Sequence, residues 1–474
     1  MEAVSPSIRF GTSGWRSVIA EAFTLENVRL VMRAIARCVK RRSEKAKLIV
    51  GYDTRFLAEA FAREGAQVLA EEGIEVFLCV EPVPTPAVAY AIIAERADGG
   101  VNITASHNPP EYQGIKFSTS DGAPALPEIT REIEEEIERL RGDGGSEDPL
   151  RHDLSGRIIA FDPREGYLHD LATKIDLPTI ARARLRVVVD PLWGTARGYL
   201  DRILREAGCE VHVLHGHRDV LFGGGAPEPS AERLRPLCDA VATGGFDLGV
   251  ATDGDADRFG IVDRGGVFVT PNQVLALLFE YLCETRSWEG GVARSVATSH
   301  QVDRAARRRG RPVYETPVGF KYIGELLKEG KILIGGEESA GLSIRGHYPE
   351  KDGILAALLV AESVARTGAS VSEQLNELYA RDGRLWSGRL EIAMTEEERA
   401  RLQRKLQAEP PADFFGCRIL EVNRQDGLKL LLEDGSWVLL RLSGTEPLAR
   451  CYAEATSEAD LEVRLEQGRT FALC

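Results

Sequence analysis

A buried strand, a helix and a second strand follow one another three times along the chain of 474 residues. The copies cover residues 47–80, 186–214 and 292–314, and the third matches the pattern most weakly. In each copy the helix is followed by a glycine, which readily adopts the left-handed backbone that ends many helices: Gly73, Gly208 and Gly310. Strands and helices that alternate at this spacing indicate βαβ units, which build parallel or mixed sheets.

These copies predict an α/β protein in which three related α/β domains carry mixed sheets. A domain commonly holds ~100–200 residues, so this chain is too long for a single core. The C-terminal part has a different pattern, which predicts a smaller α+β domain with a helix over 395–407 and strands over 416–422, 428–432 and 436–442. A Gly-rich segment at 142–149 has the composition of a linker. We expect four domains around a central cleft, bounded as 1–152, 153–262, 263–371 and 372–474.

Charge and cysteine content limit the partners and the compartment. The net charge is −14, from 59 basic and 73 acidic residues, so the chain lacks the basic footprint of a nucleic-acid-binding protein. Its eight cysteines include no C-x-x-C pair and read as reduced thiols. No run approaches the ~18 consecutive apolar residues of a membrane span, and residues 1–10 show no signal-peptide core. We expect a cytoplasmic protein that binds neither nucleic acid nor membrane, and the sequence leaves its oligomeric state open.

The loop T-A-S-H-N-P-P at 104–110 follows an apolar run and contains two prolines, each of which fixes its own φ. Such a loop can hold the hydroxyl of Ser106 outward at the end of a strand. His107 beside it offers a proton acceptor, and Lys116, in G-I-K-F at 114–117, offers a cation. Taken alone, Ser106 is either a nucleophile or an ordinary polar loop residue, because activation requires an aligned base.

A second loop, D-G-D-A-D-R at 253–258, follows the apolar run 248–251. Its carboxylates stand at alternate positions, at Asp253, Asp255 and Asp257. They converge on one point if the loop curls, and Gly254 permits the curl. Hard oxygen ligands of this kind suit Mg²⁺ or Ca²⁺ better than zinc, and a small ligand set leaves the ion open positions for phosphate chemistry. The alternative is a turn of solvated aspartates.

Further loops carry groups that suit oxygen-rich ligands. G-E-E-S-A-G at 336–341 offers carboxylates and a hydroxyl that can hydrogen-bond neighbouring sugar hydroxyls. R-L-S-G-T-E-P at 441–447, with Arg450 beyond it, combines hydroxyls, backbone N–H groups and two arginines, which favour forked pairing with phosphate. A Gly-rich stretch over 9–16, which includes Arg16, either binds phosphate or forms an ordinary turn.

The four motifs at 104–110, 253–258, 336–341 and 441–447 occur in an order and spacing that resembles the α-D-phosphohexomutase family, which includes phosphoglucomutases and phosphomannomutases. The resemblance covers essentially the whole chain. It implies an intramolecular phosphotransferase that interconverts hexose 1-phosphate and hexose 6-phosphate. It further implies a phosphoserine enzyme, a hexose 1,6-bisphosphate intermediate that also serves as activator, one Mg²⁺ per chain and a small-molecule phosphosugar as the partner.

The resemblance also implies a role for each matching residue. Ser106 would carry the transferable phosphate, and an oxygen of that phosphate would join the three aspartates of 253–257 in binding Mg²⁺. Proton transfer and charge stabilisation would fall to His107, Lys116 and Arg258. The implied phosphosugar contacts are Arg16, Lys321 (in G-F-K at 319–321), Glu337, Ser339, His347, Lys351, Arg441, Ser443, Gly444, Thr445 and Arg450. The E-E-S segment without a following Gly-His is more similar to that of glucose-preferring members than to that of the dual mannose/glucose or glucosamine types.

Other readings of the same residues predict different outcomes. An aspartate-nucleophile phosphatase could use D-G-D at 253–255 as its D-x-D, although Asp257 stands where that class usually has a hydroxyl. A Ser-His hydrolase centred on Ser106 would leave the acidic loop and the phosphate-binding loop without a task. A non-catalytic phosphosugar-binding protein is the alternative outside enzymes.

Overall fold

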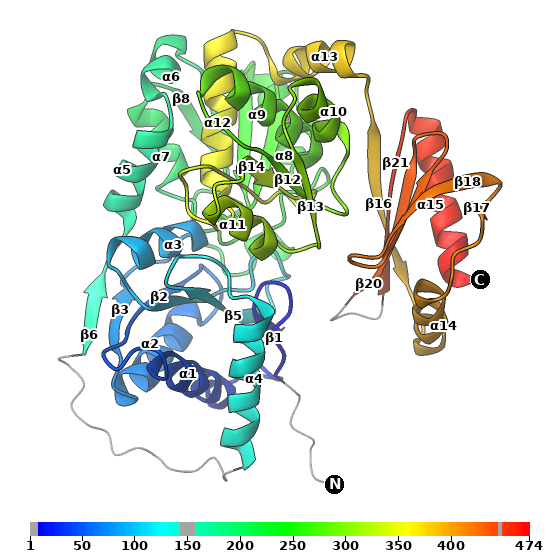
Figure 1. The fold of residues 1–474 in the computed structure, drawn as a ribbon. Helices are drawn as coiled ribbons and strands as arrows, with labels where there is room; N and C mark the ends of the chain where they lie inside the picture. The colour runs from blue at the N-terminus through cyan, green and yellow to red at the C-terminus, as the bar shows by residue number, and fades with distance from the viewer. Residues whose placement is uncertain (1–7, 143–156, 444–447) are drawn as a thin grey trace. The chain divides into compact units, whose positions relative to one another are not determined.

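The computed structural model describes residues 8–142, 157–443 and 448–474, which fall into two compact units (Figure 1). Unit 1 comprises Met1–Pro271 with Ser339–Ser372, and unit 2 comprises Asn272–Glu338 with Glu373–Cys474. This division groups the chain differently from the four predicted domains, whose boundaries stay a prediction. Most of the predicted linker at 142–149, and the boundary after residue 152, lie outside the described residues.

The N-terminal part of unit 1 is a six-stranded mixed sheet of order β1-β5-β4-β2-β3-β6. Strands β6, β3, β2 and β4 run parallel, β5 is antiparallel to β4, and β1 is antiparallel to β5. Figure 1 shows α1, α2 and α4 on one side of this sheet and α3 on the other. The elements are β1 (Trp15–Val18), α1 (Leu25–Lys40), β2 (Lys47–Tyr52), α2 (Ala58–Glu71), β3 (Glu75–Cys79), α3 (Thr85–Ala94), β4 (Gly99–Ile103), β5 (Tyr112–Thr119), α4 (Pro127–Gly142) and β6 (Ile158–Phe161).

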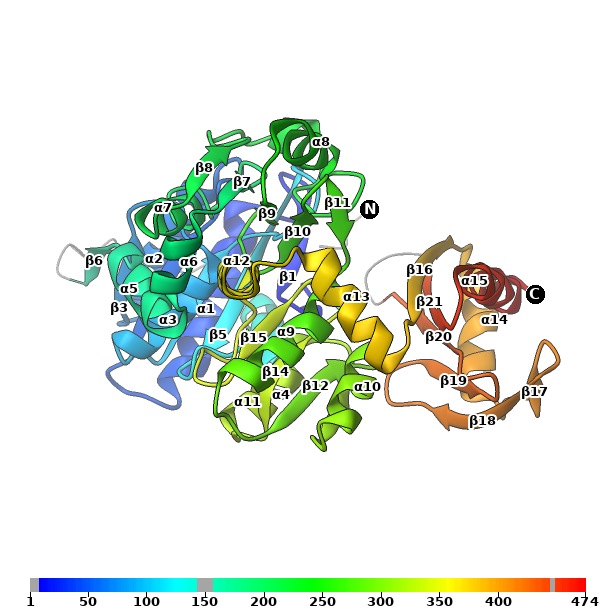
Figure 2. The same ribbon diagram turned by 90° about the horizontal axis from the view of Figure 1, so that it is seen from above.

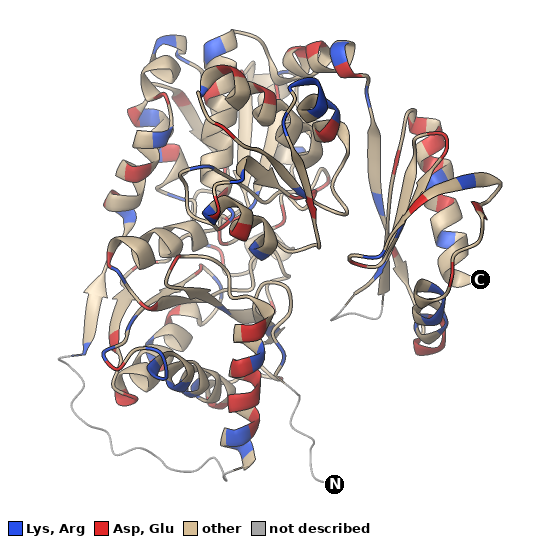
Figure 3. Ribbon diagram, viewed as in Figure 1, with Lys and Arg blue, Asp and Glu red and all other residues tan. Residues whose placement is uncertain are grey.

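Charged residues of α1 and α4, two of the helices that cover this sheet, pair with one another. Arginines of α1 face glutamates of α4, among them Arg41 with Glu132 at 3.1 Å and Arg37 with Glu136 at 3.4 Å. Beneath them the apolar stripes of both helices enter the core that covers β2 and β4. Much of the charge visible on these two helices is therefore balanced within the protein (Figure 3).

The second part of unit 1 is a five-stranded sheet of order β11-β10-β9-β7-β8. Strand β7 pairs in parallel with β8 and β9, and β10 and β11 complete an antiparallel edge. The elements are α5 (Arg164–Lys174), α6 (Leu177–Ala183), β7 (Arg186–Asp190), α7 (Leu200–Glu206), β8 (Glu210–Val213), η1 (Phe222–Gly224), α8 (Arg235–Gly244), β9 (Leu248–Thr252), β10 (Phe259–Asp263), β11 (Val267–Val269), β15 (Leu342–Ile344) and α12 (Gly353–Thr367).

Helix α12 comes from the later segment of unit 1 and completes its core. Asp352 caps its first turn by accepting from the N–H of Leu355 at 2.8 Å, and every residue from Gly353 to Val364 is buried. The helix packs against α6, β9 and β10 (Figures 1 and 2). Among the described residues no single helix is long and apolar enough to cross a membrane, although α12 and the helix after it meet that test as a bent pair.

Unit 2 combines an α/β part with a C-terminal antiparallel sheet of order β16-β21-β20-β19-β18-β17. In the α/β part, β12 lies between β13 and β14 and is parallel to both. The elements are α9 (Pro271–Thr285), β12 (Gly291–Ser295), α10 (Gln301–Arg308), β13 (Val313–Thr316), α11 (Phe320–Lys328), β14 (Ile332–Gly336), α13 (Val371–Asp382), β16 (Trp386–Ala393), α14 (Glu396–Gln407), β17 (Asp413–Phe414), β18 (Cys417–Asn423), β19 (Leu428–Leu432), β20 (Trp437–Leu442), β21 (Leu448–Ala455) and α15 (Glu458–Leu473).

The three predicted strand–helix–strand copies share one arrangement, which confirms the predicted domains of related design. The parallel triplets β4-β2-β3, β9-β7-β8 and β14-β12-β13 have the same order, with the first strand of each copy in the centre. The three glycines after the helices have φ of +88°, +82° and +64°, as predicted. In each triplet a predicted functional loop follows the last strand in sequence, which is β4, β9 or β14. These loops lie at the carboxyl edge, where ligands of α/β proteins bind.

A buried polar cluster joins the two segments of unit 2. Lys429 of β19, 1% exposed, donates to Glu315 at 2.9 Å and lies 2.9 Å from Nε2 of His300. Glu454 of β21 accepts from the backbone N–H of His300 and from Nε1 of Trp437, the latter at 2.8 Å. The α/β part and the C-terminal sheet of unit 2 are therefore held together by polar groups that are shielded from water.

This cluster predicts an acid-sensitive contribution to stability. Burial, reinforced by Arg294 and Lys429, lowers the pKa of His300 from 6.5 to about 4. Between these pH values His300 binds a proton in the unfolded chain but not in the folded chain. The free energy of unfolding therefore falls as the pH drops from about 6.5 to about 4. His300→Gln keeps an acceptor for Lys429 and should remove this part of the dependence, which is worth about 3 kcal/mol.

Urea unfolding of the full chain, followed by tryptophan fluorescence between pH 7 and pH 4, measures this effect. The exposed His212 in unit 1 provides a matched control, and His212→Gln should keep the wild-type pH dependence. Parallel pH profiles for His300→Gln and the wild-type protein would contradict the prediction.

Candidate active site

Ser106 lies in the loop between β4 and β5, directly after the parallel triplet of unit 1. Its backbone is left-handed, with φ of +54°, which turns the side chain out of the strand direction. The hydroxyl donates to Oδ2 of Asp253 at 2.7 Å, and Nδ1 of His107 lies 3.4 Å from the serine Oγ. The predicted nucleophile therefore meets the predicted acidic loop, although 147 residues separate them.

The acidic loop is the turn of the hairpin between β9 and β10. Its carboxylates are buried and offer oxygen atoms within 4.8 Å of one another, as predicted for Asp253, Asp255 and Asp257. Gly254 is required here, because a Cβ at this position would stand 2.7 Å from the carbonyl oxygen of Ser106. The glycine thus permits the serine loop and the acidic loop to meet.

Two lysines enter this acidic cluster from other elements. Lys116, on β5, places Nζ 2.6 Å from Oδ2 of Asp255 and 2.6 Å from Oδ2 of Asp257. Lys351, in the segment before α12, lies 2.9 Å from the same oxygen of Asp257. Burial alone would raise the pKa of Asp257, but the two lysines outweigh it and hold that pKa well below its usual range. Burial and the two neighbouring carboxylates instead raise the pKa of Asp253 well above its usual range.

The donor set fits a small divalent cation. Oδ1 of Asp255 and Oδ1 of Asp257 are buried and have no hydrogen-bond partner among the described residues. Carboxylate oxygens are the ligands that Mg²⁺ prefers. Behind Asp255, the hydroxyl of Thr85 donates to Oδ2 at 2.5 Å and accepts from Nδ2 of Asn102 at 2.8 Å. This supporting pair could not be predicted from the sequence, because Thr85 lies 170 residues from Asp255.

Two arginines, Arg16 and Arg258, act on His107 beside Ser106. The guanidinium of Arg16 donates to Oδ1 of Asn108 at 2.6 Å, and burial together with Arg258 lowers the pKa of Arg16 to about 10. The backbone N–H of Arg258 donates to Oδ1 of Asp253 at 3.0 Å. Burial, Arg258 and Arg16 lower the pKa of His107 well below 6.5, so its imidazole is neutral at physiological pH and can accept a proton.

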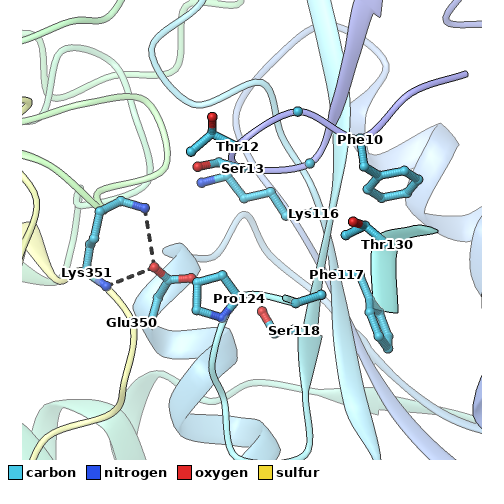
Figure 4. Close-up of a pocket in the computed structure, with 13 residues that line it drawn as sticks. Phe10, Thr12, Ser13, Lys116, Phe117, Ser118, Pro124, Thr130, Glu350 and Lys351 are labelled. Carbon is cyan, nitrogen blue, oxygen red and sulfur yellow. Dashed lines mark hydrogen bonds and ion pairs between the residues drawn. The ribbon is translucent and has the colours of Figure 1, made fainter. Parts of the chain in front are cut away.

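A pocket opens beside Lys116 (Figure 4). The Gly-rich N-terminal loop forms one wall, where Thr12 and Ser13 lie near the Lys116 side chain, and Glu350 with Lys351 forms another. Glu350 accepts from the backbone N–H of Lys351 at 2.8 Å and from its ammonium at 3.3 Å. The stretch at 9–16 therefore lies beside Lys116, and its binding of phosphate stays a prediction.

His347 is held by protein groups. Its Nε2 lies 2.8 Å from Oδ2 of Asp352, its Nδ1 lies 3.0 Å from Nζ of Lys174, and its side chain is fully buried. Asp352 also caps α12 and accepts from Tyr167 at 2.8 Å. In this arrangement the imidazole supports the start of α12, and its predicted contact with a phosphosugar would require both bonds to open. That contact stays a prediction.

The predicted sugar-binding residues lie where the chain passes from unit 2 to unit 1. Glu337, directly after β14, accepts from the N–H of Gly319 at 2.8 Å. This bond places the 336–341 loop beside the predicted G-F-K segment, in which Lys321 is buried in the first turn of α11. Ser339 is the first residue of the later segment of unit 1. The structure therefore brings Glu337 and the Lys321 segment together.

The predicted phosphate-binding residues of unit 2 lie on β20 and β21. Arg441 and Arg450 are direct cross-strand partners, although like charges in that position repel. Each has an acidic neighbour: Asp426 is 2.8 Å from Arg441, and Glu391 is 3.3 Å from Arg450. Ser443 is buried at the end of this hairpin, whereas the predicted contacts at residues 444 and 445 lie outside the described residues. The two arginines thus lie side by side, and their binding of phosphate stays a prediction.

Family models match the chain along most of its length. The four domain models of phosphoglucomutase/phosphomannomutase occur in order: α/β/α domain I at 7–142, domain II at 165–266, domain III at 270–381 and the C-terminal domain at 391–467.

Relatives and solved structures agree with this assignment. The phosphoglucomutase/phosphomannomutase of Thermococcus kodakarensis is 32% identical, over 97% of each chain. A "probable phosphoglucosamine mutase" of Methanothermobacter thermautotrophicus is 34% identical, over 95% of this chain and 94% of its own. The crystal structure of a phosphoglucomutase/phosphomannomutase family protein from Burkholderia thailandensis superposes with a TM-score of 0.82 at 26% identity and covers 99% of this chain and 97% of its own. Because the relatives align from end to end and the domains follow in the same order, this chain belongs to the α-D-phosphohexomutase family and is an intramolecular phosphotransferase.

Proposed function

We propose that this enzyme interconverts hexose 1-phosphate and hexose 6-phosphate through phospho-Ser106 and a hexose 1,6-bisphosphate, with glucose phosphates as the preferred substrates. The observation that carries the proposal is the 2.7 Å contact between the Ser106 hydroxyl and Asp253 of the buried acidic loop. A serine that donates to clustered carboxylates, with lysine and arginine side chains nearby, suits phosphate chemistry. It does not suit acyl transfer, which has no use for the acidic loop.

In the first half-reaction, phospho-Ser106 donates its phosphoryl group to the free hydroxyl of a hexose monophosphate. The bond between phosphorus and Oγ breaks as a bond to the sugar oxygen forms, and the proton of the sugar hydroxyl passes through His107 to Oγ, which leaves as the serine hydroxyl. Phosphoryl transfer is catalysed mainly by positioning and by neutralising charge on the transferring group. Lys116 and Arg258 supply positive charge, and Lys116 also ties the acidic loop to β5.

In the second half-reaction, the bisphosphate presents its other phosphate to Ser106. The bond between that phosphorus and its sugar oxygen breaks as a bond to Oγ forms, the Oγ proton passes through His107 to the sugar oxygen, and the isomeric monophosphate leaves. The phosphate that is not reacting must also be bound, and we assign that role to the cross-strand pair Arg441 and Arg450. Glu337, Ser339, Lys321, Lys351 and Arg16 are the proposed contacts for sugar hydroxyls and phosphate, with His347, Gly444 and Thr445 as further predicted members.

Asp253, Asp255 and Asp257 would hold Mg²⁺ together with a phosphoserine oxygen, one ion per chain. When bound, the ion would supply charge stabilisation to a group that already carries roughly −1.5 to −2 charges. A hexose 1,6-bisphosphate is the proposed activator, because it can phosphorylate Ser106. We also propose a cytoplasmic location.

Phosphorus NMR tests the reaction and ranks the sugars at once. The protein, with Mg²⁺ and a trace of glucose 1,6-bisphosphate, is given glucose 1-phosphate, mannose 1-phosphate or glucosamine 1-phosphate in separate tubes. We expect 6-phosphate signals to grow, fastest with the glucose compound. A faster reaction with mannose or glucosamine would replace the sugar assignment and leave the mutase standing. Growth of free phosphate alone would favour a phosphatase, and unchanged spectra in all tubes would favour a non-catalytic phosphosugar-binding protein.

A further inference from the structure

A fully buried arginine, Arg55, binds the backbone of the serine loop. Arg55 follows β2, and neither it nor its partner Asp53 is exposed to solvent. An isolated charge in a protein interior is strongly unfavourable, so a buried guanidinium must be paired and hydrogen-bonded. Asp53 provides the charge partner, with Oδ2 3.1 Å from Nε of Arg55.

Every donor of this guanidinium has an acceptor. An arginine side chain carries five N–H donors. Besides the bond from Nε to Asp53, one terminal nitrogen donates to the carbonyls of Pro109 at 2.7 Å and Tyr112 at 3.1 Å. The other donates to the carbonyls of Ser106 at 2.7 Å and Asn108 at 2.6 Å. Four of the five donors therefore bind the backbone of the serine loop, between residues 106 and 112.

Asp53, the partner of Arg55, is also linked to the serine loop through Thr104. Oδ2 of Asp53 accepts from the hydroxyl of Thr104 at 2.7 Å, and Oγ1 of Thr104 accepts from the backbone N–H of Ser106 at 2.9 Å. The guanidinium also lies over the ring of Phe222, 5.0 Å from its centroid. Arg55, Asp53 and Thr104 thus bind both the N–H and the carbonyl of Ser106.

This anchoring explains how Ser106 keeps an unfavourable conformation. A non-glycine residue in the left-handed region costs of order 1 kcal/mol or more and persists only where its surroundings over-determine it. The conformation matters because it aims the hydroxyl at Asp253. Four hydrogen bonds from one rigid, charged fork can hold the turn in place.

We propose that Arg55 is a positioning residue for Ser106: it fixes the carbonyl groups of the loop so that the hydroxyl, or its phosphate, stays aligned for transfer. The inference rests on the proposed function. Arg55 reaches the reacting atoms only through the loop backbone, so its loss should slow transfer more than it weakens sugar binding. Lysine cannot replace it, because a compact ammonium with three donors cannot reproduce the planar fork.

Arg55→Lys tests this role. We expect kcat to fall by at least about 10²-fold, the effect of misplacing a reacting group by about 1 Å, while KM for the hexose 1-phosphate changes less than about threefold. The matched control is Arg294→Lys in unit 2, which removes another buried guanidinium, one bound to Asp303 at 2.7 Å. That variant should lose stability but keep kcat within about threefold. A comparable loss of kcat in both variants would overturn the proposal.

Hydrogen–deuterium exchange provides a readout that does not depend on activity. In Arg55→Lys the amides of Ser106, Asn108 and Tyr112 should exchange at least about 10-fold faster, whereas those of 253–258 should not change. Unchanged exchange in the serine loop would overturn the proposal. If the wild-type protein shows no mutase activity, the proposed function fails, but exchange still decides whether Arg55 holds the loop.

A second variant keeps the test decisive if Arg55→Lys does not fold. Thr104→Val preserves the shape of the side chain and removes only the hydroxyl that links Asp53 to the N–H of Ser106. It should shift kcat and amide exchange in the same direction, by a smaller factor. Wild-type kcat and wild-type amide exchange in a folded Thr104→Val protein would contradict the proposal that Arg55, Asp53 and Thr104 hold Ser106 in place.

Discussion

Ser106→Ala is expected to reduce turnover by at least about 10⁴-fold, because it removes the atom that carries the phosphoryl group in both half-reactions. No nearby hydroxyl in the serine loop can take its place, since Thr104 Oγ1 is committed to Asp53 and to the backbone of Ser106. The variant should also lose the phosphoserine signal in phosphorus NMR. Coupled assays of hexose 6-phosphate formation measure the first effect.

The fold should survive this substitution. The lost hydroxyl donates one hydrogen bond, to Asp253, and removing such a donor costs about 1–3 kcal/mol at most. Ser343→Ala is the matched control, because Ser343 is equally buried and donates one bond of 2.8 Å, to the carbonyl of Tyr348. It should match the small loss of stability and keep activity. Full activity in Ser106→Ala would remove the phosphoserine mechanism.

Removal of divalent cations is expected to have the second-largest effect. Chelation should lower turnover to below about 1% of the starting rate, and added Mg²⁺ should restore it, because two highly charged phosphate groups must be neutralised in one buried site. Asp255→Asn should weaken binding of Mn²⁺, measured by electron paramagnetic resonance, by at least about 10-fold, since carboxylate charge sets the affinity of such sites.

The control for the metal site is another buried aspartate. Asp263 is 1% exposed and accepts from the backbone N–H groups of Val371 at 2.9 Å and Ser372 at 2.7 Å. Asp263→Asn should destabilise the protein and leave Mn²⁺ affinity unchanged. If chelation did not change activity and both variants bound Mn²⁺ equally well, the acidic loop would not be the metal site.

The sequence predicted the parts of the site that depend on local pattern. Ser106 and the three aspartates each follow an apolar strand and stand on a loop shaped by proline or glycine, so motif and strand pattern agree. Lys116 was predicted as a nearby cation. That it binds Asp255 and Asp257 could not be foreseen, because 139 and 141 residues separate them and only the assembled sheets bring them together.

Residues that act from behind the site gave no sequence signal. Arg55 stands in an ordinary turn after β2, and its importance arises from four carbonyl groups that lie more than 50 residues away. His347 shows the converse case. Its motif predicts a ligand contact, yet burial between Asp352 and Lys174 gives its ring protein partners, which composition and spacing do not reveal.

The two compact units have a consequence for biosynthesis. Unit 1 cannot close its core with residues 1–271 alone, because α12 reaches it only with the segment that ends at residue 372. At a typical 5–20 residues per second, the ribosome needs roughly 5–20 s to make residues 272–372. During that time the apolar faces of β9, β10 and α6 lack their cover. The nascent chain should therefore be a client for chaperones that shield apolar surface, and a gene truncated after residue 271 should yield an aggregating product.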